Sequence, residues 1–148
     1  MSPPKRLEVP AVSGNHAALA PLAHGPSDPN SFEGPFNARQ LTRIDEALTL
    51  SSRESGLTFS LYVGELSVPT RTAAEELFAQ LTPDAVLIAV SPGQRSLQIV
   101  TGEHSSARLP SRACALAALG MRASFANGDL VGGIVTGLRM MSDAAGHP

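Results

Sequence analysis

The chain has 148 residues, a formal net charge of −2 and 16% charged residues, so no strong field favours nucleic acid or an anionic membrane. Trp is absent and Tyr occurs once, which leaves few aromatic platforms for stacking bases, and we expect no nucleic-acid partner. The single cysteine excludes an internal disulfide and fits a reducing compartment, so the expected location is the cytoplasm.

Residues 1–36 are expected to form a disordered N-terminal arm. This segment carries about half of the chain's 12 prolines and shows no apolar periodicity. A stretch such as 21–29 cannot bury enough surface to offset the entropy of ordering it. Prolines and glycines also break the sequence after the basic pair Lys5-Arg6, so we expect no secretory signal here.

The folded domain is expected to span residues 37–143. Asn37 and Gln40 match a capping box, and the helix that they open has Leu41, Ile44 and Leu48 on one face. Gly56 is the expected C-terminal cap. Residues 57–63 then alternate apolar and polar side chains, which predicts a strand covered on one face.

A second helix is expected to start near Thr72, with Glu75 as its capping-box partner, and Pro83 prevents its continuation. Residues 85–90 are continuously apolar, as expected for a central strand covered on both faces. The sequence of residues 91–94 fits a type II turn, after which residues 96–101 should pair antiparallel with the preceding strand.

Residues 102–109 are expected to form a polar loop before a helix that opens at Ser111 and ends at Asn127-Gly128. Asp129 caps the last helix, and residues 144–148 are expected to be a flexible tail. Arg112, Arg122 and Asp129 interrupt the most apolar region, so we expect no membrane anchor.

These elements follow the order α-β-α-β-β-α-α. A right-handed crossover makes the first two strands parallel, and the hairpin adds an antiparallel third strand. Helices can then cover both faces of this small mixed sheet, so the predicted class is α/β, a three-layer α/β/α sandwich. We expect the domain to be a monomer.

Two acidic residues are expected at the carboxyl edge of the parallel strands, where open α/β sheets tend to bind ligands. Glu65 follows the first strand, and Asp129 lies at the returning helix corner, near Gln94 and Arg95. The opposite edge collects Asp84 with Glu103, His104 and Ser111. Each acid also has a structural interpretation: Asp129 is a good N-cap, and Glu65 can be a solvated loop residue.

The sequence lacks the residues that several catalytic mechanisms require. Cys114 has no arginine six positions later, as a cysteine-phosphatase loop requires, and its apolar helix face indicates an inert core thiol. No Asp-x-Asp pair follows a strand, no Arg-His-Gly triplet occurs, and no histidine-rich metal pattern is present. The glycines after Asn127 lie within or at the start of a helix, so they indicate close helix packing and no nucleotide loop.

Four segments resemble the TPM domain family. They are the strand at 85–90, the following strand at 95–102, the segment Phe125-Ala126-Asn127-Gly128-Asp129, and Leu109-Pro110-Ser111. The similarity covers roughly residues 40–143 and is greatest to an actinobacterial group known only as a domain of unknown function. The resemblance implies an α/β/α sandwich. Some members resemble acid phosphatases of the thylakoid lumen with acidic residues that can hold calcium, and others are accessory domains.

The resemblance implies an acidic pocket at Asp129, with Asp84 as a weaker match. Together with Glu65, which the topology places at the same edge as Asp129, they are the candidate metal ligands, with calcium as the ion. The sequence departs from the family at Ser111, where the family has an aspartate, and this lowers the charge available to a cation. The family's usual signal peptide and C-terminal anchor are not expected in this chain either.

The leading interpretation is therefore a TPM-like accessory or ligand-binding domain, with an unidentified protein or small molecule as its partner. The first alternative is a weak metal-assisted acid phosphatase that uses Asp129 and Glu65 as cation ligands. The second is a self-associating module built on the alanine- and glycine-rich helices.

Overall fold

The computed structural model describes residues 17–18 and 36–148. From α2 onward, the long elements follow the predicted order α-β-α-β-β-α-α, which confirms the predicted α/β class. The described elements are, in chain order, β1 (Ala17–Ala18), α2 (Ala38–Ser55), β2 (Thr58–Val63), α3 (Thr70–Phe78), β3 (Ala85–Ser91), the 3-10 helix η2 (Pro92–Gln94), β4 (Ser96–Thr101), α4 (Ser105–Arg108), α5 (Ser111–Ala126) and α6 (Leu130–Ala145).

The described strands form one mixed sheet in the order β1-β2-β3-β4. β2 and β3 are parallel, with Leu61 opposite Ile88, and β3 and β4 are antiparallel, with Ile88 opposite Ile99. Both pairings were predicted. The short strand β1 pairs parallel with β2 and thus brings two residues of the expected arm onto the sheet. Phe36, the last residue of the expected arm, is buried in the apolar core, so the folded domain begins one residue earlier than predicted. Residues 1–16 and 19–35 lie outside the described residues.

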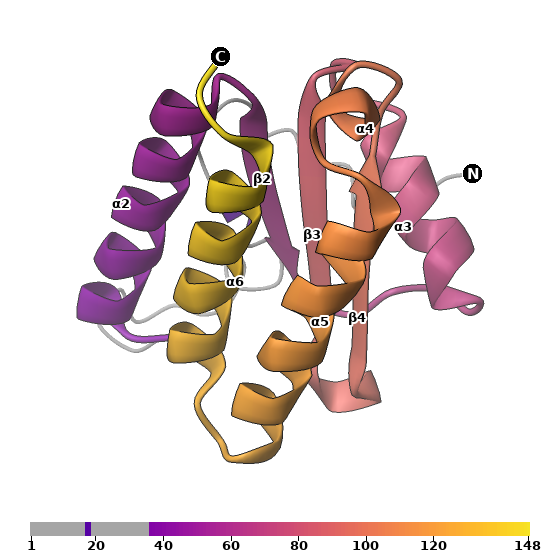
Figure 1. The fold of residues 1–148 in the computed structure, drawn as a ribbon. Helices are drawn as coiled ribbons and strands as arrows, with labels where there is room; N and C mark the ends of the chain where they lie inside the picture. Colours follow the sequence, from indigo (N-terminus) through magenta and orange to yellow (C-terminus); the bar gives the residue numbers. More distant parts are fainter. Residues whose placement is uncertain (1–16, 19–35) are drawn as a thin grey trace.

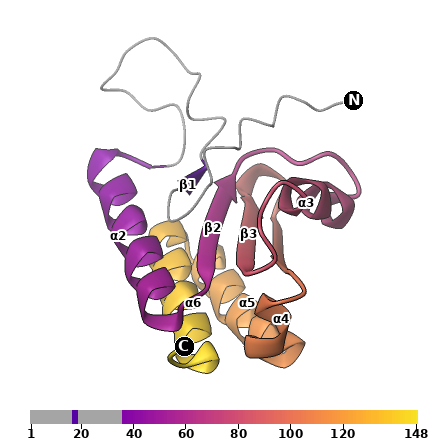
Figure 2. The same ribbon diagram turned by 90° about the horizontal axis from the view of Figure 1, so that it is seen from above.

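Helices cover both faces of the sheet, as the predicted sandwich requires. α2, α5 and α6 lie on one face and α3 lies on the other (Figures 1 and 2). The larger apolar core lies under the three helices and includes the fully buried Ile44, Ile88 and Leu138. A smaller core joins α3 to the second face through Ala74 and Leu87. No helix in the described ranges is long and apolar enough to cross a bilayer.

The predicted helix ends are formed by side chains close in sequence. The side chain of Asn37 accepts a hydrogen bond from the backbone N–H of Gln40 at 2.8 Å, and Gln40 Oε1 accepts from the N–H of Asn37 at 2.9 Å. Gly56 ends α2 with a φ of 80°, a left-handed conformation that favours glycine. Asp129 caps α6 by accepting from the N–H of Gly132 at 2.8 Å.

Some local predictions were wrong. α3 starts at Thr70 after Pro69, without a side-chain cap, so Thr72 lies inside the helix. Residues 92–94 form a 3-10 turn, and the positive φ falls on Arg95 and not on Gly93 as a type II turn would need. β2 is buried on both faces, because α3 packs on the side that alternation predicted to be open. Part of the predicted polar loop forms α4.

The last helix extends further than expected, and the C-terminal residues are held by side-chain contacts. α6 continues to Ala145, two residues past the predicted domain boundary. One guanidinium nitrogen of Arg108 lies within hydrogen-bonding distance, 2.9–3.1 Å, of the carbonyl oxygens of Ser55, Ala145, Gly146 and His147. The residues expected as a flexible tail thus contact α4 through Arg108, and His147 Nδ1 lies 3.3 Å from the carbonyl oxygen of Glu54 near the end of α2.

Candidate functional site

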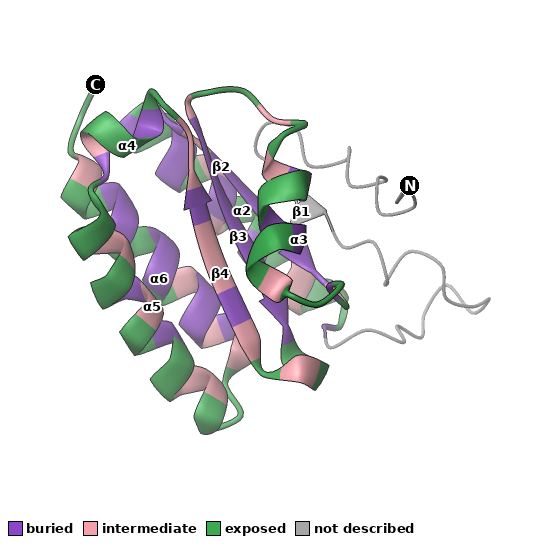
Figure 3. Cartoon of the chain, turned by 90° about the vertical axis from the view of Figure 1, so that its right-hand side faces the viewer, coloured by how far each residue is buried: buried purple, intermediate pink, exposed green. Residues whose placement is uncertain are grey.

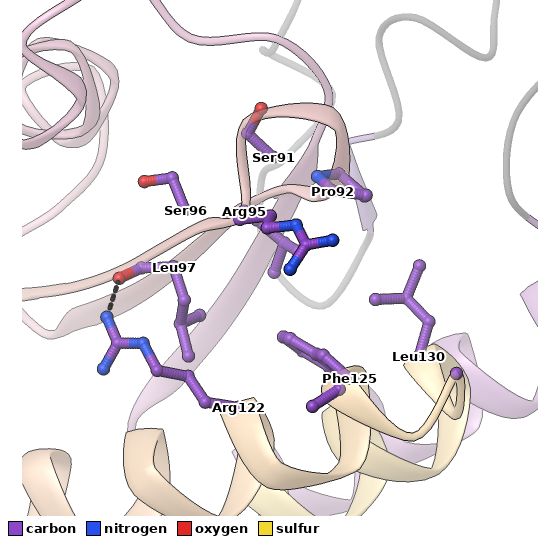
Figure 4. Close-up of a pocket in the computed structure, with 11 residues that line it drawn as sticks. Ser91, Pro92, Arg95, Ser96, Leu97, Arg122, Phe125 and Leu130 are labelled. Atoms are coloured by element: carbon purple, nitrogen blue, oxygen red, sulfur yellow. Dashed lines mark hydrogen bonds between the residues drawn. The ribbon is translucent and has the colours of Figure 1, made fainter.

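A cavity of about 530 Å³ opens at the carboxyl edge of the parallel strands. It lies between the β3–β4 turn and the corner where α5 passes into α6 (Figure 4). This is the edge at which the topology predicted a site. Its lining residues are Val90, Ser91, Pro92, Arg95, Ser96, Leu97, Arg122, Phe125, Ala126, Gly128 and Leu130.

The cavity combines positive charge with an apolar wall. Two of its lining residues, Arg95 and Arg122, carry positive charge, and none of them is acidic. Both hydroxyl groups of the lining already donate to other side chains, Ser91 to Gln94 and Ser96 to Thr70. The polar groups of the lining side chains that remain for a ligand are therefore mainly those of the two guanidinium groups.

The two arginines are held differently. Arg122, on α5, donates to the backbone oxygen of Leu97 at 3.0 Å, as Figure 4 shows. Arg95 extends from the turn toward the α5–α6 corner in the same view. Its guanidinium has no hydrogen-bond partner within the part of the chain that the structure describes. Its φ of 53° is also the one positive φ of a non-glycine residue in that part. Strained backbone of this kind is common at ligand sites.

The position of Arg95 is fixed by the residue before it. Gln94 binds the backbone of Leu66 through both ends of its amide, accepting from the N–H and donating to the C=O, each at 2.8 Å. Ser91 donates to the same amide oxygen. The loop after β2 and the turn after β3 are thereby joined, so the rim that carries Arg95 is preorganised.

The predicted acidic residues do not line this cavity. Asp129 lies between two lining residues, but its carboxylate caps α6. Glu65 lies in the loop after β2 with an exposed side chain, while its backbone oxygen accepts from the Tyr62 hydroxyl at 2.7 Å. Both residues are thus at the predicted edge, and neither lines the cavity.

Asp84 lies at the opposite end of β3, as the strand order predicts, roughly 20 Å along the strand from the other two acids. Its carboxylate accepts from the hydroxyls of Thr82 and, at 3.0 Å, Thr58. The Thr82 bond is the main cause that lowers the pKa of Asp84, helped by Thr58 and His104 and opposed by burial. In the described part of the chain, no three His, Cys, Asp or Glu residues are grouped to hold a metal ion.

Cys114 is half-buried on α5, and burial raises the pKa of its thiol against a smaller opposing effect of Arg71. A raised pKa keeps the thiol protonated and poorly nucleophilic. This agrees with the interpretation of Cys114 as a packing residue.

The fold and the cavity together define a small α/β/α domain with a cationic, apolar-walled cavity at the carboxyl edge of its parallel strands. The chain belongs to the family described as domain of unknown function (DUF5130), whose model matches residues 12–142. The match begins inside the segment expected to be an arm.

Relatives of similar length occur in actinobacteria. The uncharacterized protein Rv2468c of Mycobacterium tuberculosis is 34% identical over 155 residues, which covers 93% of each chain. The uncharacterized protein MT2543 of another strain of that species gives the same values.

Three solved structures share the fold. The BA42 protein of the psychrophilic bacterium Bizionia argentinensis has a TM-score of 0.69 at 14% identity, covering 76% of this chain and 83% of its own. The N-terminal domain of a P. gingivalis protein has a TM-score of 0.66 at 15% identity, covering 75% and 76%. The N-terminal domain of the cg2496 protein of Corynebacterium glutamicum has a TM-score of 0.63 at 14% identity, covering 84% and 86%. At these identities the similarity concerns the fold alone.

Proposed function

We propose that this chain is a TPM-like accessory domain that binds a small amphiphilic anion, a carboxylate or phosphate ester attached to an apolar group. The observation that carries the proposal is the pair Arg95 and Arg122 beside an apolar wall without an acidic residue in the lining. Guanidinium groups bind carboxylate and phosphate oxygens through geometrically matched hydrogen bonds.

The cavity suits a ligand with an apolar part. Its volume of about 530 Å³ falls within the range of small-molecule sites. Leu97, Phe125 and Leu130 supply apolar surface, and removing such surface from water stabilises a complex by roughly 25 cal/mol per Å². A purely polar anion would leave these apolar side chains exposed to water, so we expect an apolar group on the ligand to increase its affinity.

The same features give less support to the metal-assisted phosphatase. Asp129 already accepts a backbone hydrogen bond. The cavity beside it is lined by Arg95 and Arg122, which repel a divalent cation. Arginines can stabilise a phosphoryl group, but the described cavity lining offers no carboxylate that would act as a general base beside it.

The test is a titration of the 15N-labelled full chain with benzoate and phenyl phosphate. Benzyl alcohol and benzylamine serve as neutral and cationic probes of matched size. We expect both anions to shift the amides of residues 90–97 and 122–130, and we expect the neutral and cationic probes to bind at least about tenfold more weakly, because charged hydrogen bonds contribute about 1.5–3 kcal/mol. Equal shifts from benzyl alcohol would overturn the proposal.

Two variants test whether anion binding depends on the positive charge of the cavity or on the net charge of the chain. Arg95→Gln should weaken binding of both anions about five- to tenfold, after discounting for the exposure of this side chain. Arg139→Gln on the exposed side of α6 removes the same charge away from the cavity and should leave binding unchanged. Equal losses in the two variants would mean that net charge, and not the cavity, attracts the anion. If benzoate and phenyl phosphate bind to different extents, the tighter-binding probe shows whether the site prefers a carboxylate or a phosphate ester.

A further inference from the structure

β4 is the last strand of the described sheet, and its outer edge is occupied by side chains from two directions. Arg122 of α5 donates to the carbonyl oxygen of Leu97 at 3.0 Å. Arg71 of α3 donates to the carbonyl oxygen of Ile99 at 2.9 Å. α5 and α3 lie on opposite faces of the sheet (Figure 3). The two guanidinium groups therefore reach the same edge from opposite faces.

The ladder geometry explains why these two carbonyls are available. In an antiparallel pair, alternate residues direct both backbone groups away from the partner strand. Leu97 and Ile99 are two positions apart, so their N–H groups share the outward direction of their carbonyls. No other described element lies along this edge, which Figure 3 shows at the front between α5 and α3. The edge is therefore open to a further strand once the arginines move.

We propose that β4 is a docking edge for an extended, acidic segment of another protein, which adds to the sheet as one more strand. This inference goes beyond the proposed anion-binding function and does not depend on it. The partner's backbone N–H groups would replace Arg71 and Arg122 at the carbonyls of Ile99 and Leu97. The displaced guanidinium groups would then pair with carboxylates of the incoming segment, so no donor or acceptor is left without a partner.

Charge favours this occupant over a second copy of the chain. Arg71 and Arg122 flank the edge, Arg95 precedes it, and the one carboxylate paired with them in the described part is Glu75, 3.0 Å from Arg71. Two copies paired through β4 would bring these arginines against each other, which is a common way in which natural edges avoid self-association. An acidic strand turns the same charges into attraction.

The test uses the 15N-labelled full chain and an eight-residue peptide in which pairs of valines alternate with pairs of glutamates, with blocked ends. Because successive side chains of a strand point to opposite faces, this pattern places glutamates on both faces, where Arg71 and Arg122 lie. We expect this peptide to shift the amides of Leu97, Ile99 and Thr101 and to slow their hydrogen exchange at concentrations up to about 2 mM, as befits a weak strand addition. A valine–lysine peptide tests charge. The glutamate peptide N-methylated on two adjacent valines and two adjacent glutamates tests backbone pairing, because adjacent N–H groups point to opposite edges and neither edge can then complete a ladder. Both should bind at least about tenfold more weakly.

A matched pair of double variants assigns the charge effect. Arg71→Gln with Arg122→Gln should remove most of the preference for the glutamate peptide over the lysine peptide. Arg53→Gln with Arg139→Gln removes two charges on exposed positions of α2 and α6 and should keep the preference. Arg95→Gln should weaken small-anion binding about five- to tenfold but keep peptide binding. A failure of the anion proposal is therefore distinguishable from a failure of the peptide proposal.

Three outcomes would overturn the proposal. The first is an absence of shifts at residues 96–101 with the glutamate peptide, and the second is equal binding by its N-methylated form. The third is a set of shifts at these residues that follows protein concentration without any peptide, which would assign the edge to a second copy of this chain.

Discussion

Replacement of Arg108 by methionine should destabilise the domain, because this side chain closes the ends of two helices. One guanidinium nitrogen lies 2.9 Å from the carbonyl oxygen of Ser55, the last residue of α2, and 3.0 Å from that of Ala145, the last residue of α6. It also lies 3.1 Å from the carbonyls of Gly146 and His147. Cations near helix C-termini also interact favourably with the helix dipole.

The magnitude follows from the number of protons. The nitrogen carries two, so at most two of the four contacts are full hydrogen bonds, each contributing about 1.5–3 kcal/mol when the donor is charged. Arg108 is half-buried, so solvent screening lowers the sum, and we expect a loss of about 2 kcal/mol. For a domain of this size that corresponds to a Tm lower by roughly 8 °C.

Chemical denaturation and thermal melting measure the loss, and amide exchange of residues 144–147 measures the local effect. Arg108→Lys should recover part of the stability, since it keeps the charge without the planar donor group. Arg139→Met, at an exposed position, should change stability by less than about 0.5 kcal/mol. If Arg108→Met were as stable as the parent chain and residues 144–147 exchanged equally fast in both, the anchoring role of Arg108 would be wrong, and the expectation of a flexible tail would stand.

Three more outcomes follow from the structure. Ile88→Ala should cost about 2–5 kcal/mol by denaturation, because Ile88 is fully buried at the centre of the sheet, whereas Ile88→Val should cost about 1 kcal/mol. The pKa of Asp84 is lowered in the fold. Its contribution to stability is therefore complete above the unfolded pKa of about 4 and is lost as the pH falls through the lower, folded pKa. We expect the Tm difference between Asp84→Asn and the parent chain to shrink below about pH 4. Asp129→Asn should keep the Tm within about 2 °C, because Asn caps helices about as well, and should alter neither phosphate-ester hydrolysis nor calcium-dependent shifts. Wild-type hydrolysis that Asp129→Asn eliminates would instead support the metal-assisted phosphatase.

The long helices and strands and their order could be predicted from the sequence, because they depend on short-range chemistry. The cap at Asn37, the stop at Gly56 and the cap at Asp129 each need partners within four residues, and the structure confirms all three. The continuous apolar run of β3 indicated a central strand, and every residue of that strand is buried. The order of elements and the handedness of the crossover then led to the α/β/α sandwich.

Local errors arose where a neighbour far along the chain changed the environment. β2 alternates apolar and polar residues like a strand with one open face, but α3 covers that face, and Ser60 is fully buried there. Periodicity reports the hydropathy of a segment and not what packs against it. The predicted loop at 102–109 similarly contains α4, whose first residue, Ser105, is held by its hydroxyl on the backbone oxygen of Ala85 at 2.7 Å.

The site depended on tertiary structure most of all. Sequence reasoning pointed to the edge at which the cavity lies and placed Arg95 there, but it assigned the chemistry to Asp129 and Glu65, since acidic residues are the recognisable metal ligands. Only the folded chain brings Arg122 beside Arg95 and turns the Asp129 carboxylate back onto its own helix. Arg108 likewise reaches Ser55 across 53 positions of sequence. The direction of a side chain is set by the packing of elements that are distant in sequence. A local sequence pattern therefore does not predict which charged side chains will line the cavity.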